Sequence, residues 1–163
     1  MALLKLALVM LVGAALAARA RGGEAGRPAF KVYPVGTVQK EDGVTRLAIA
    51  DDYAKALKGL DGFSHVVVLY WFDKNDTPRK RSILQVHPRG NPRNPLTGVF
   101  ACRAPVRPNL IALSVCRVLA VEGNAVRVDK IDVFDDTPIL DLKPHIPSID
   151  SPKEVALPDW LRK

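Results

Sequence analysis

The chain has 163 residues, of which 48% are apolar and 25% charged, and it contains 13 prolines and two cysteines. This length suits one domain, because a core of about 100 to 150 residues already buries itself well. The composition excludes a wholly disordered chain and a polytopic membrane protein, and two cysteines exclude a disulfide framework or a four-thiolate zinc site. A formal charge of +7 points to a polyanionic partner such as a nucleic acid, although many basic proteins are merely soluble.

The N-terminal segment differs in composition from the rest. Residues 1–20 hold a basic start, an apolar run and then Ala18-Arg19-Ala20, which is the outline of a secretory signal peptide. The run is too short for a bilayer core of about 30 Å, so we expect no stable membrane insertion. The other interpretation is that the start codon has been assigned too far upstream, so that residues 1–20 are not made. The protein would then be cytoplasmic and not exported. Residues 21–29 are glycine-rich and are expected to form a flexible tether.

Strand patterns begin at Phe30. Residues 30–38 are rich in Val, Tyr and Phe but include Pro34, which suits an edge strand. A turn at Glu41-Asp42-Gly43 leads into residues 45–49, which form the returning arm of a hairpin.

One short helix and a buried strand follow. Apolar residues recur at helical spacing between Asp51 and Gly62, where an aspartate can cap the start and the glycine ends the helix. Residues 66–72 are seven apolar residues in a row, which predicts a strand buried on both faces.

A long irregular segment interrupts the strands. Residues 77–110 contain six prolines, so only short strands at 82–86 and 99–102 are expected there. Such a stretch inside a compact domain is more often functional than decorative.

The last strands are predicted at 111–121 and 125–133. The apolar phase of the second slips near Lys130, for which a bulge is the simplest explanation. Residues 151–163 form a proline-rich and charged tail, in which Trp160 is expected to dock against the body. With one convincing helix, the pattern predicts an all-β fold, either a barrel or a sandwich.

Charge is segregated along the second half of the chain. Residues 77–121 contain eight basic side chains and no acidic one. Held on one face by proline-stiffened loops, they could follow the phosphates of a nucleic acid, although a solvated loop surface is the plainer alternative. The nucleic-acid-binding candidates are Arg79, Lys80, Arg81, Arg89, Arg93 and Arg107.

Five aspartates then fall within thirteen residues, from Asp129 to Asp141. Carboxylates beside a buried strand can hold a cationic or hydroxyl-bearing ligand. Asp135-Asp136-Thr137-Pro138 is also typical of a simple turn, the interpretation that we prefer for Asp136. The sequence has no glycine-rich phosphate loop, Rossmann fingerprint or nucleophile elbow, and its three histidines lack metal-ligand spacing, so no metal site is predicted.

Three ordered motifs resemble the signature of the TsaA-like, or TrmO, family. They are Thr97-Gly-Val-Phe-Ala-Cys-Arg-Ala-Pro-Val-Arg-Pro-Asn109, Ile111-Ala-Leu-Ser114 and Asp135-Asp-Thr-Pro-Ile-Leu-Asp-Leu-Lys-Pro144. The resemblance covers about residues 30–150 and implies a small closed β-barrel that dimerises and binds S-adenosylmethionine near the dimer interface. The activity it implies is methylation of N6 of threonylcarbamoyladenosine beside the anticodon of tRNA.

The resemblance also implies site residues. The cofactor-contacting positions would be Asp73, Lys74, Arg103, Leu113, Asp129, Lys130, Ile131 and Asp132. A base should help to remove the proton of the acceptor nitrogen, and Asp132 is the first candidate and Asp135 the second. Arg103 and Arg107 would orient the cofactor carboxylate or tRNA phosphates.

The chain departs from the family pattern beside this site. Family members often have His-Gln where this chain has Asp73-Lys74, Pro in place of Leu110, and Gly in place of Ala112 and of Asp136. An aspartate at a position that requires positive φ would be strained. These departures, together with the signal-peptide-like segment, suggest an alternative function. In this alternative the chain is an exported, catalytically altered domain that binds a nucleoside-type ligand.

Overall fold

The structure is a computed structural model that describes residues 28–162. The signal-peptide-like segment and most of the expected tether lie outside these residues. The residues up to Val32 form a unit separate from the one that begins at Tyr33. Residues 28–32 have no regular secondary structure.

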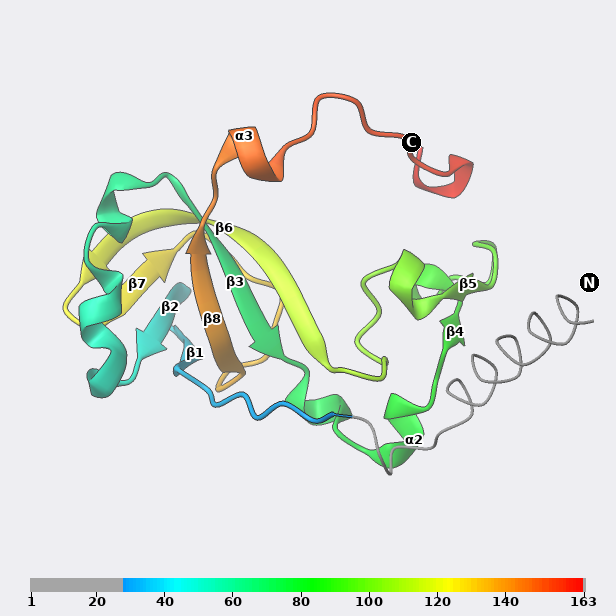
Figure 1. Ribbon diagram of the computed structural model, residues 1–163, viewed down its shortest axis with the longest axis horizontal. Helices are drawn as coiled ribbons and strands as arrows, with labels where there is room; N and C mark the ends of the chain where they lie inside the picture. The colour runs from blue at the N-terminus through cyan, green and yellow to red at the C-terminus, as the bar shows by residue number, and fades with distance from the viewer. Residues whose placement is uncertain (1–27, 163) are drawn as a thin grey trace, which may run out of the picture. The chain divides into compact units, whose positions relative to one another are not determined.

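Six antiparallel strands close into a barrel in the order β1-β2-β7-β6-β3-β8 (Figure 1). Their bounds are β1 (Gly36–Glu41), β2 (Val44–Ile49), β3 (His65–Trp71), β6 (Ile111–Glu122), β7 (Ala125–Val128) and β8 (Pro138–Pro144). Two more strands, β4 (Gln85–Val86) and β5 (Thr97–Gly98), pair with each other in the segment between β3 and β6. The expected all-β fold and closed barrel are confirmed.

Within residues 28–162, helical structure is limited to short segments. The α-helices are α2 (Pro78–Arg81) and α3 (Pro147–Asp150), and the 3-10 helices are η1 (Asp51–Leu57), η2 (Leu60–Gly62), η3 (Asp73–Asn75), η4 (Pro88–Gly90), η5 (Val99–Ala101) and η6 (Asp159–Leu161). The helix expected between Asp51 and Gly62 is therefore two 3-10 turns. Gly59 separates them with a φ of 88°, a left-handed conformation that ends the helical hydrogen bonding.

Alternate side chains of the strands fill the barrel. Leu47, Val66, Val68, Val126 and Ile139 are fully buried there. The expectation that the apolar run is buried on both faces agrees with β3, because Val67, which points outward, exposes only 9% of its surface. Strand β3 pairs with both β6 and β8, so its backbone lies within the sheet.

The first strand is not the expected edge strand. It begins at Gly36, after Pro34, and pairs with β2 on one side and β8 on the other. Barrel closure gives every strand two neighbours, so the proline lies ahead of the ladder instead of marking an open edge.

The seventh strand ends earlier than expected. β7 stops at Val128, where the Asp129 carboxylate accepts a 2.9 Å hydrogen bond from the backbone N–H of Arg117 in β6. The prediction of a bulge near Lys130 is wrong. The change in the apolar alternation there marks the end of β7. The irregularity in the β6–β7 pairing lies between Val118 and Ala120.

Other boundaries also differ. Strand β8 was not anticipated, because prolines bound it and Asp141 and Lys143 break its apolar pattern, although proline is acceptable at a strand's first position. The short strand expected at 82–86 is limited to β4, and residues 99–101 form η5. In the tail, Trp160 is partly exposed on η6.

The turn before β8 holds Asp136 at a φ of 59°, so the positive φ that would strain an aspartate is present. Replacing Asp136 with Gly is expected to raise the free energy of unfolding by about 0.5 to 1 kcal/mol, because glycine adopts this conformation without steric cost. Its backbone N–H would keep the 2.8 Å hydrogen bond to the Val38 carbonyl. Urea denaturation measures the change. Asp136→Ala is the control, since alanine keeps the strain, and equal stability of the two variants would contradict the explanation.

Candidate functional site

A cavity of about 760 Å³ lies where β3 ends and β6 begins. Its walls come from the end of β3 and η3, the start of β6, the loop ahead of β6 and the loop ahead of β8. Both aromatic and charged side chains line it. The aromatic ones are Tyr70, Trp71, Phe72, Phe100 and Phe134, and the charged ones are Asp73, Lys74, Arg103, Arg107 and Asp132.

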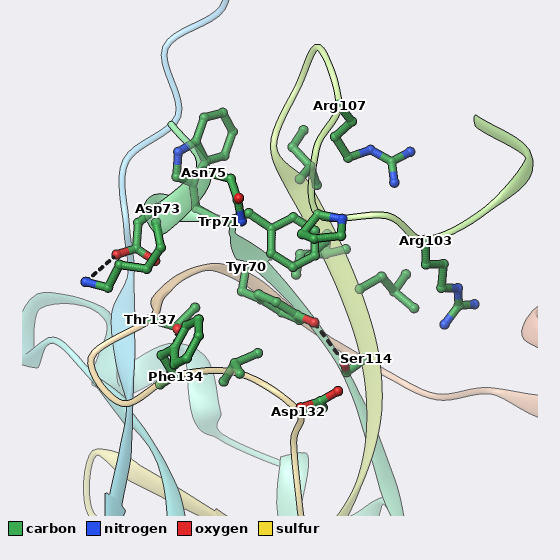
Figure 2. Close-up of a pocket in the computed structure, with 18 of the residues that line it drawn as sticks. Tyr70, Trp71, Asp73, Asn75, Arg103, Arg107, Ser114, Asp132, Phe134 and Thr137 are labelled. Atoms are coloured by element: carbon green, nitrogen blue, oxygen red, sulfur yellow. Dashed lines mark hydrogen bonds and ion pairs between the residues drawn. The ribbon is translucent and has the colours of Figure 1, made fainter. Parts of the chain in front are cut away.

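Tyr70 and Ser114 meet inside this cavity (Figure 2). The Tyr70 hydroxyl lies 3.2 Å from the Ser114 hydroxyl, and either can donate. The pairing of Val68 with Ser114 and of Tyr70 with Ala112 puts all four side chains on the inner side of the barrel. Sequence reasoning missed both hydroxyls as site residues, although Ser114 closes the second motif.

A second cluster fixes the outer wall of the cavity. The Asp76 carboxylate accepts hydrogen bonds from the Arg81 guanidinium at 2.7 Å and the Trp71 indole at 3.1 Å. These two hydrogen bonds lower the pKa of the Asp76 carboxyl, and the one from Arg81 has the larger effect. Arg81 also lies 5.2 Å from the centre of the Trp71 ring and donates to the Pro108 carbonyl at 3.0 Å. The end of β3 and the loop ahead of β6 are thereby held together.

Comparison with known proteins identifies the family. Residues 30–151 match the family described as the tRNA-methyltransferase O N-terminal domain. The chain belongs to this family. It is 43% identical over 124 residues to a probable S-adenosyl-L-methionine-binding protein of Methanocaldococcus jannaschii, covering 76% of this chain and 98% of that one. It is 41% identical over 113 residues to the human tRNA (adenine(37)-N6)-methyltransferase, covering 69% of this chain and 25% of that protein.

Solved structures agree with this family. A crystal structure of TrmO from Pseudomonas aeruginosa superposes with a TM-score of 0.61 at 26% identity and covers 79% of this chain. This chain spans only 62% of that one. The resemblance seen in the three motifs is thus confirmed, as is the barrel that it implied.

The structure divides the cofactor positions inferred from the TrmO resemblance into two groups. Asp73, Lys74, Arg103, Leu113 and Asp132 line the cavity. The other three, Asp129, Lys130 and Ile131, are not among its lining residues. Their assignment as cofactor contacts therefore has no support from the cavity's geometry.

Asp129 and Ile131 face other parts of the barrel. Desolvation acts to raise the pKa of the Asp129 carboxyl, but hydrogen bonds from the backbone N–H groups of Lys130 and Arg117 outweigh it and lower that pKa. Ile131 is buried with the core cluster. Both residues thus anchor the chain on either side of Lys130 and leave Asp132 as the first carboxylate of this loop at the cavity.

The two candidate bases are also separated. Asp132 lines the cavity, as Ser114 does (Figure 2). Asp135 instead accepts a 2.8 Å hydrogen bond from the backbone N–H of Lys40 in β1. The geometry therefore favours Asp132 as the base, and Asp135 serves the turn.

The basic candidates are spread over α2, η4 and the loops that follow η4. Arg79, Arg89 and Arg93 are exposed. The Lys80 ammonium donates to the Lys74 carbonyl at 2.9 Å, and the Arg81 guanidinium makes the internal contacts given above. Arg107 lines the cavity (Figure 2). Nucleic-acid contact by these six residues stays a prediction.

The departures from the TrmO pattern can now be located. Lys74 Nζ and Asp73 Oδ2 form an ion pair at 2.9 Å on the cavity wall. Leu110 is fully buried and Ala112 is buried inside the barrel. Among these departures from the family pattern, the Asp73–Lys74 pair is thus the one that places charged atoms on the cavity wall.

Both cysteines are free. Burial, with a smaller effect from the charge of Asp129, raises the pKa of the Cys116 thiol to about 11, whereas Cys102 lines the cavity. Within residues 28–162, no group of three or more His, Cys, Asp or Glu side chains is arranged to hold a metal ion. None of the helices in that range is long and apolar enough to span a membrane.

Proposed function

We propose that this protein transfers a methyl group from S-adenosylmethionine to N6 of a tRNA adenosine, and that this adenosine carries a threonylcarbamoyl group beside the anticodon. One observation supports the proposal above others: the three family motifs, separate in sequence, supply walls of one cavity. The first contributes Arg103, the second the run from Ile111 to Ser114, and the third Thr137.

The residues of the cavity suit S-adenosylmethionine. Its volume of about 760 Å³ lies within the usual range for small-molecule sites. Trp71, Phe100 and Phe134 offer apolar faces to an adenine ring. The Asp73 carboxylate can accept hydrogen bonds from ribose hydroxyls or an amino group, and the Arg103 guanidinium can hold a carboxylate.

The same residues can perform the transfer. S-adenosylmethionine supplies an electrophilic methyl group when bound, so the protein must chiefly align the two reactants and exclude water. The carbamoyl group on the acceptor nitrogen withdraws its lone pair and makes its N–H more acidic. Asp132 accepts that proton, and the Tyr70–Ser114 pair, which lines the same cavity, can orient the acceptor through hydrogen bonds.

Basic side chains would hold the tRNA. Arg79, Arg89 and Arg93 are exposed on the segment between β3 and β6, and that segment ends in a wall of the cavity. Arginine binds phosphate oxygens through paired hydrogen bonds. The positive charge noted in the composition would therefore guide the anticodon region toward the cavity, with an affinity that falls as salt rises.

The substrate is tested with two tRNA preparations, one with and one without threonylcarbamoyl at the adenosine. We expect methyl transfer from labelled S-adenosylmethionine to be at least about 100-fold faster with the modified tRNA, because polar groups built to bind the modification stay unpaired without it. Mass spectrometry of the released nucleosides identifies the product. Equal rates on both preparations would contradict the substrate, and no transfer to either would contradict the activity.

A homodimer is part of the proposal. Four outward-facing residues of β6 are apolar and expose between 38% and 49% of their surface: Ile111, Leu113, Val115 and Leu119. We call them the β6 stripe; the exposed Arg117 lies between the last two. Exposed apolar patches often mark interfaces. Ile111 and Leu113 also line the cavity, so a second copy on this stripe would lie beside the site.

Replacing Val115 with Glu tests the dimer. A charge in the middle of the β6 stripe is expected to weaken dimerisation at least about 100-fold, because an unpaired carboxylate would be buried at the interface. Light scattering after size-exclusion chromatography gives the mass. Leu96→Glu is the control, since Leu96 is also exposed but lies outside β6. A monomeric wild type, or a dimeric Val115→Glu, would contradict the proposal.

A cytoplasmic location follows from tRNA as the substrate. N-terminal sequencing of the native protein tests it. A mature start at Arg21 would contradict the cytoplasmic location and favour an exported domain that binds a nucleoside-type ligand.

A further inference from the structure

Lys40, in β1, holds the loop that carries Asp132. Its ammonium donates to the carbonyl of Ile131 at 2.9 Å and to that of Val133 at 2.5 Å. Its backbone N–H donates to the Asp135 carboxylate at 2.8 Å. One residue thus contacts this loop at three points, and two of them are the residues directly before and after Asp132.

The arrangement follows from how β1 meets the chain ahead of β8. The backbone N–H of Val38 donates to the Thr137 carbonyl at 2.9 Å, and that of Asp136 donates back to Val38 at 2.8 Å. The positive φ of Asp136 then turns the chain away from β1. Lys40 is the next residue on the same edge of β1, so its backbone N–H takes the Asp135 side chain in place of a backbone partner.

The ammonium group suits this role for a chemical reason. It carries three donors on a compact charged centre, so it can bond to two carbonyl oxygens at once. Both carbonyls belong to a segment outside the ladder, in which the structure assigns no strand between Val128 and Pro138. The direction of these two carbonyl groups therefore depends on contacts with side chains, and the Lys40 ammonium makes such a contact with each of them.

We propose that Lys40 is a positioning residue of the methyl-transfer site, which fixes residues 131–135 so that Asp132 and Phe134 face the cavity. The inference rests on the proposed function for its kinetic consequence. Its structural consequence, an ordered loop, does not depend on that function. Lys40 is not among the residues that line the cavity, so it acts through Asp132 and its neighbours.

Three variants test the proposal in the full-length protein. Lys40→Met removes the charge at similar length, Lys40→Arg keeps it, and Lys55→Met is the control because Lys55 is an exposed lysine on η1. Lys40→Met is expected to lower kcat about tenfold with KM for tRNA within about twofold, because a displaced catalytic group slows the chemical step. Lys40→Arg should recover most of that rate, and Lys55→Met should match the wild type.

A double variant shows whether Lys40 acts through Asp132. If it does, adding Lys40→Met to Asp132→Asn should lower the rate no further, because residues that act together are not additive. Rates that multiply would overturn the positioning role. So would Lys40→Met with kcat unchanged, or Lys40→Arg as slow as Lys40→Met.

Backbone order parameters from NMR give a readout that needs no substrate. For the amides of residues 131–135, values near about 0.85 in the wild type should fall toward about 0.6 in Lys40→Met and remain high in Lys55→Met. Unchanged order in Lys40→Met would overturn the inference. A wild type without methyl transfer would contradict the proposed function alone, and the order parameters would still decide on Lys40.

Discussion

Asp132→Asn is expected to lower the single-turnover rate of methyl transfer by about 100-fold to 10,000-fold, the usual contribution of a positioned base. The amide keeps the size of the side chain but cannot accept the proton of the acceptor nitrogen. Binding of S-adenosylmethionine, measured by calorimetry, should change little. A rate within about twofold of the wild type would exclude Asp132 as the proton acceptor.

Asp135→Asn is the matched control on the same loop. Its amide oxygen can still accept the hydrogen bond from the backbone N–H of Lys40, so the turn should persist and the rate should stay close to that of the wild type. A large loss in Asp135→Asn beside an active Asp132→Asn would reverse the assignment of the two carboxylates.

Gly36→Ala should destabilise the barrel by about 3 kcal/mol or more. A methyl group at this position would lie 2.1 Å from the carbonyl oxygen of Ala48 and 2.9 Å from the Cα of Ile49. These are backbone atoms of β2 at the point where β1 pairs with both β2 and β8, so neither can move aside without breaking the ladder. Urea denaturation followed by circular dichroism measures the loss.

Gly62→Ala is the control for the glycine itself. An added Cβ at Gly62 has no neighbour within 4 Å, so its stability should stay within about 0.5 kcal/mol of the wild type. Equal stability of the two variants would show that β1 and β2 are further apart than the structure has them.

Local patterns predicted most of the barrel. The apolar run that became β3 and the long strand that became β6 were identified because burial on one or both faces leaves a clear periodicity. Strand β8 was missed, since its prolines and charged residues resemble a loop. Its burial comes from pairing with β3 and β1, strands far away in the sequence.

The candidate site was predicted less completely. The resemblance to the family pointed to Arg103, Leu113 and Asp132, all of which line the cavity. The roles of Asp129 and Asp135 could not be separated, because both look like ligand carboxylates until their backbone partners are known. Tyr70 looked like one more apolar residue of a buried strand.

What the sequence by itself determined is the class of fold, the family and the segment richest in positive charge. Each of these depends on residue type and local spacing. Only the tertiary structure decided which aspartate faces the cavity, that Tyr70 meets Ser114, and that Lys40 holds the Asp132 loop. Those contacts join residues 44 and 91 positions apart. The pairing of β3 with β6 makes the first, and the approach of β1 to the chain ahead of β8 makes the second. No local pattern encodes either.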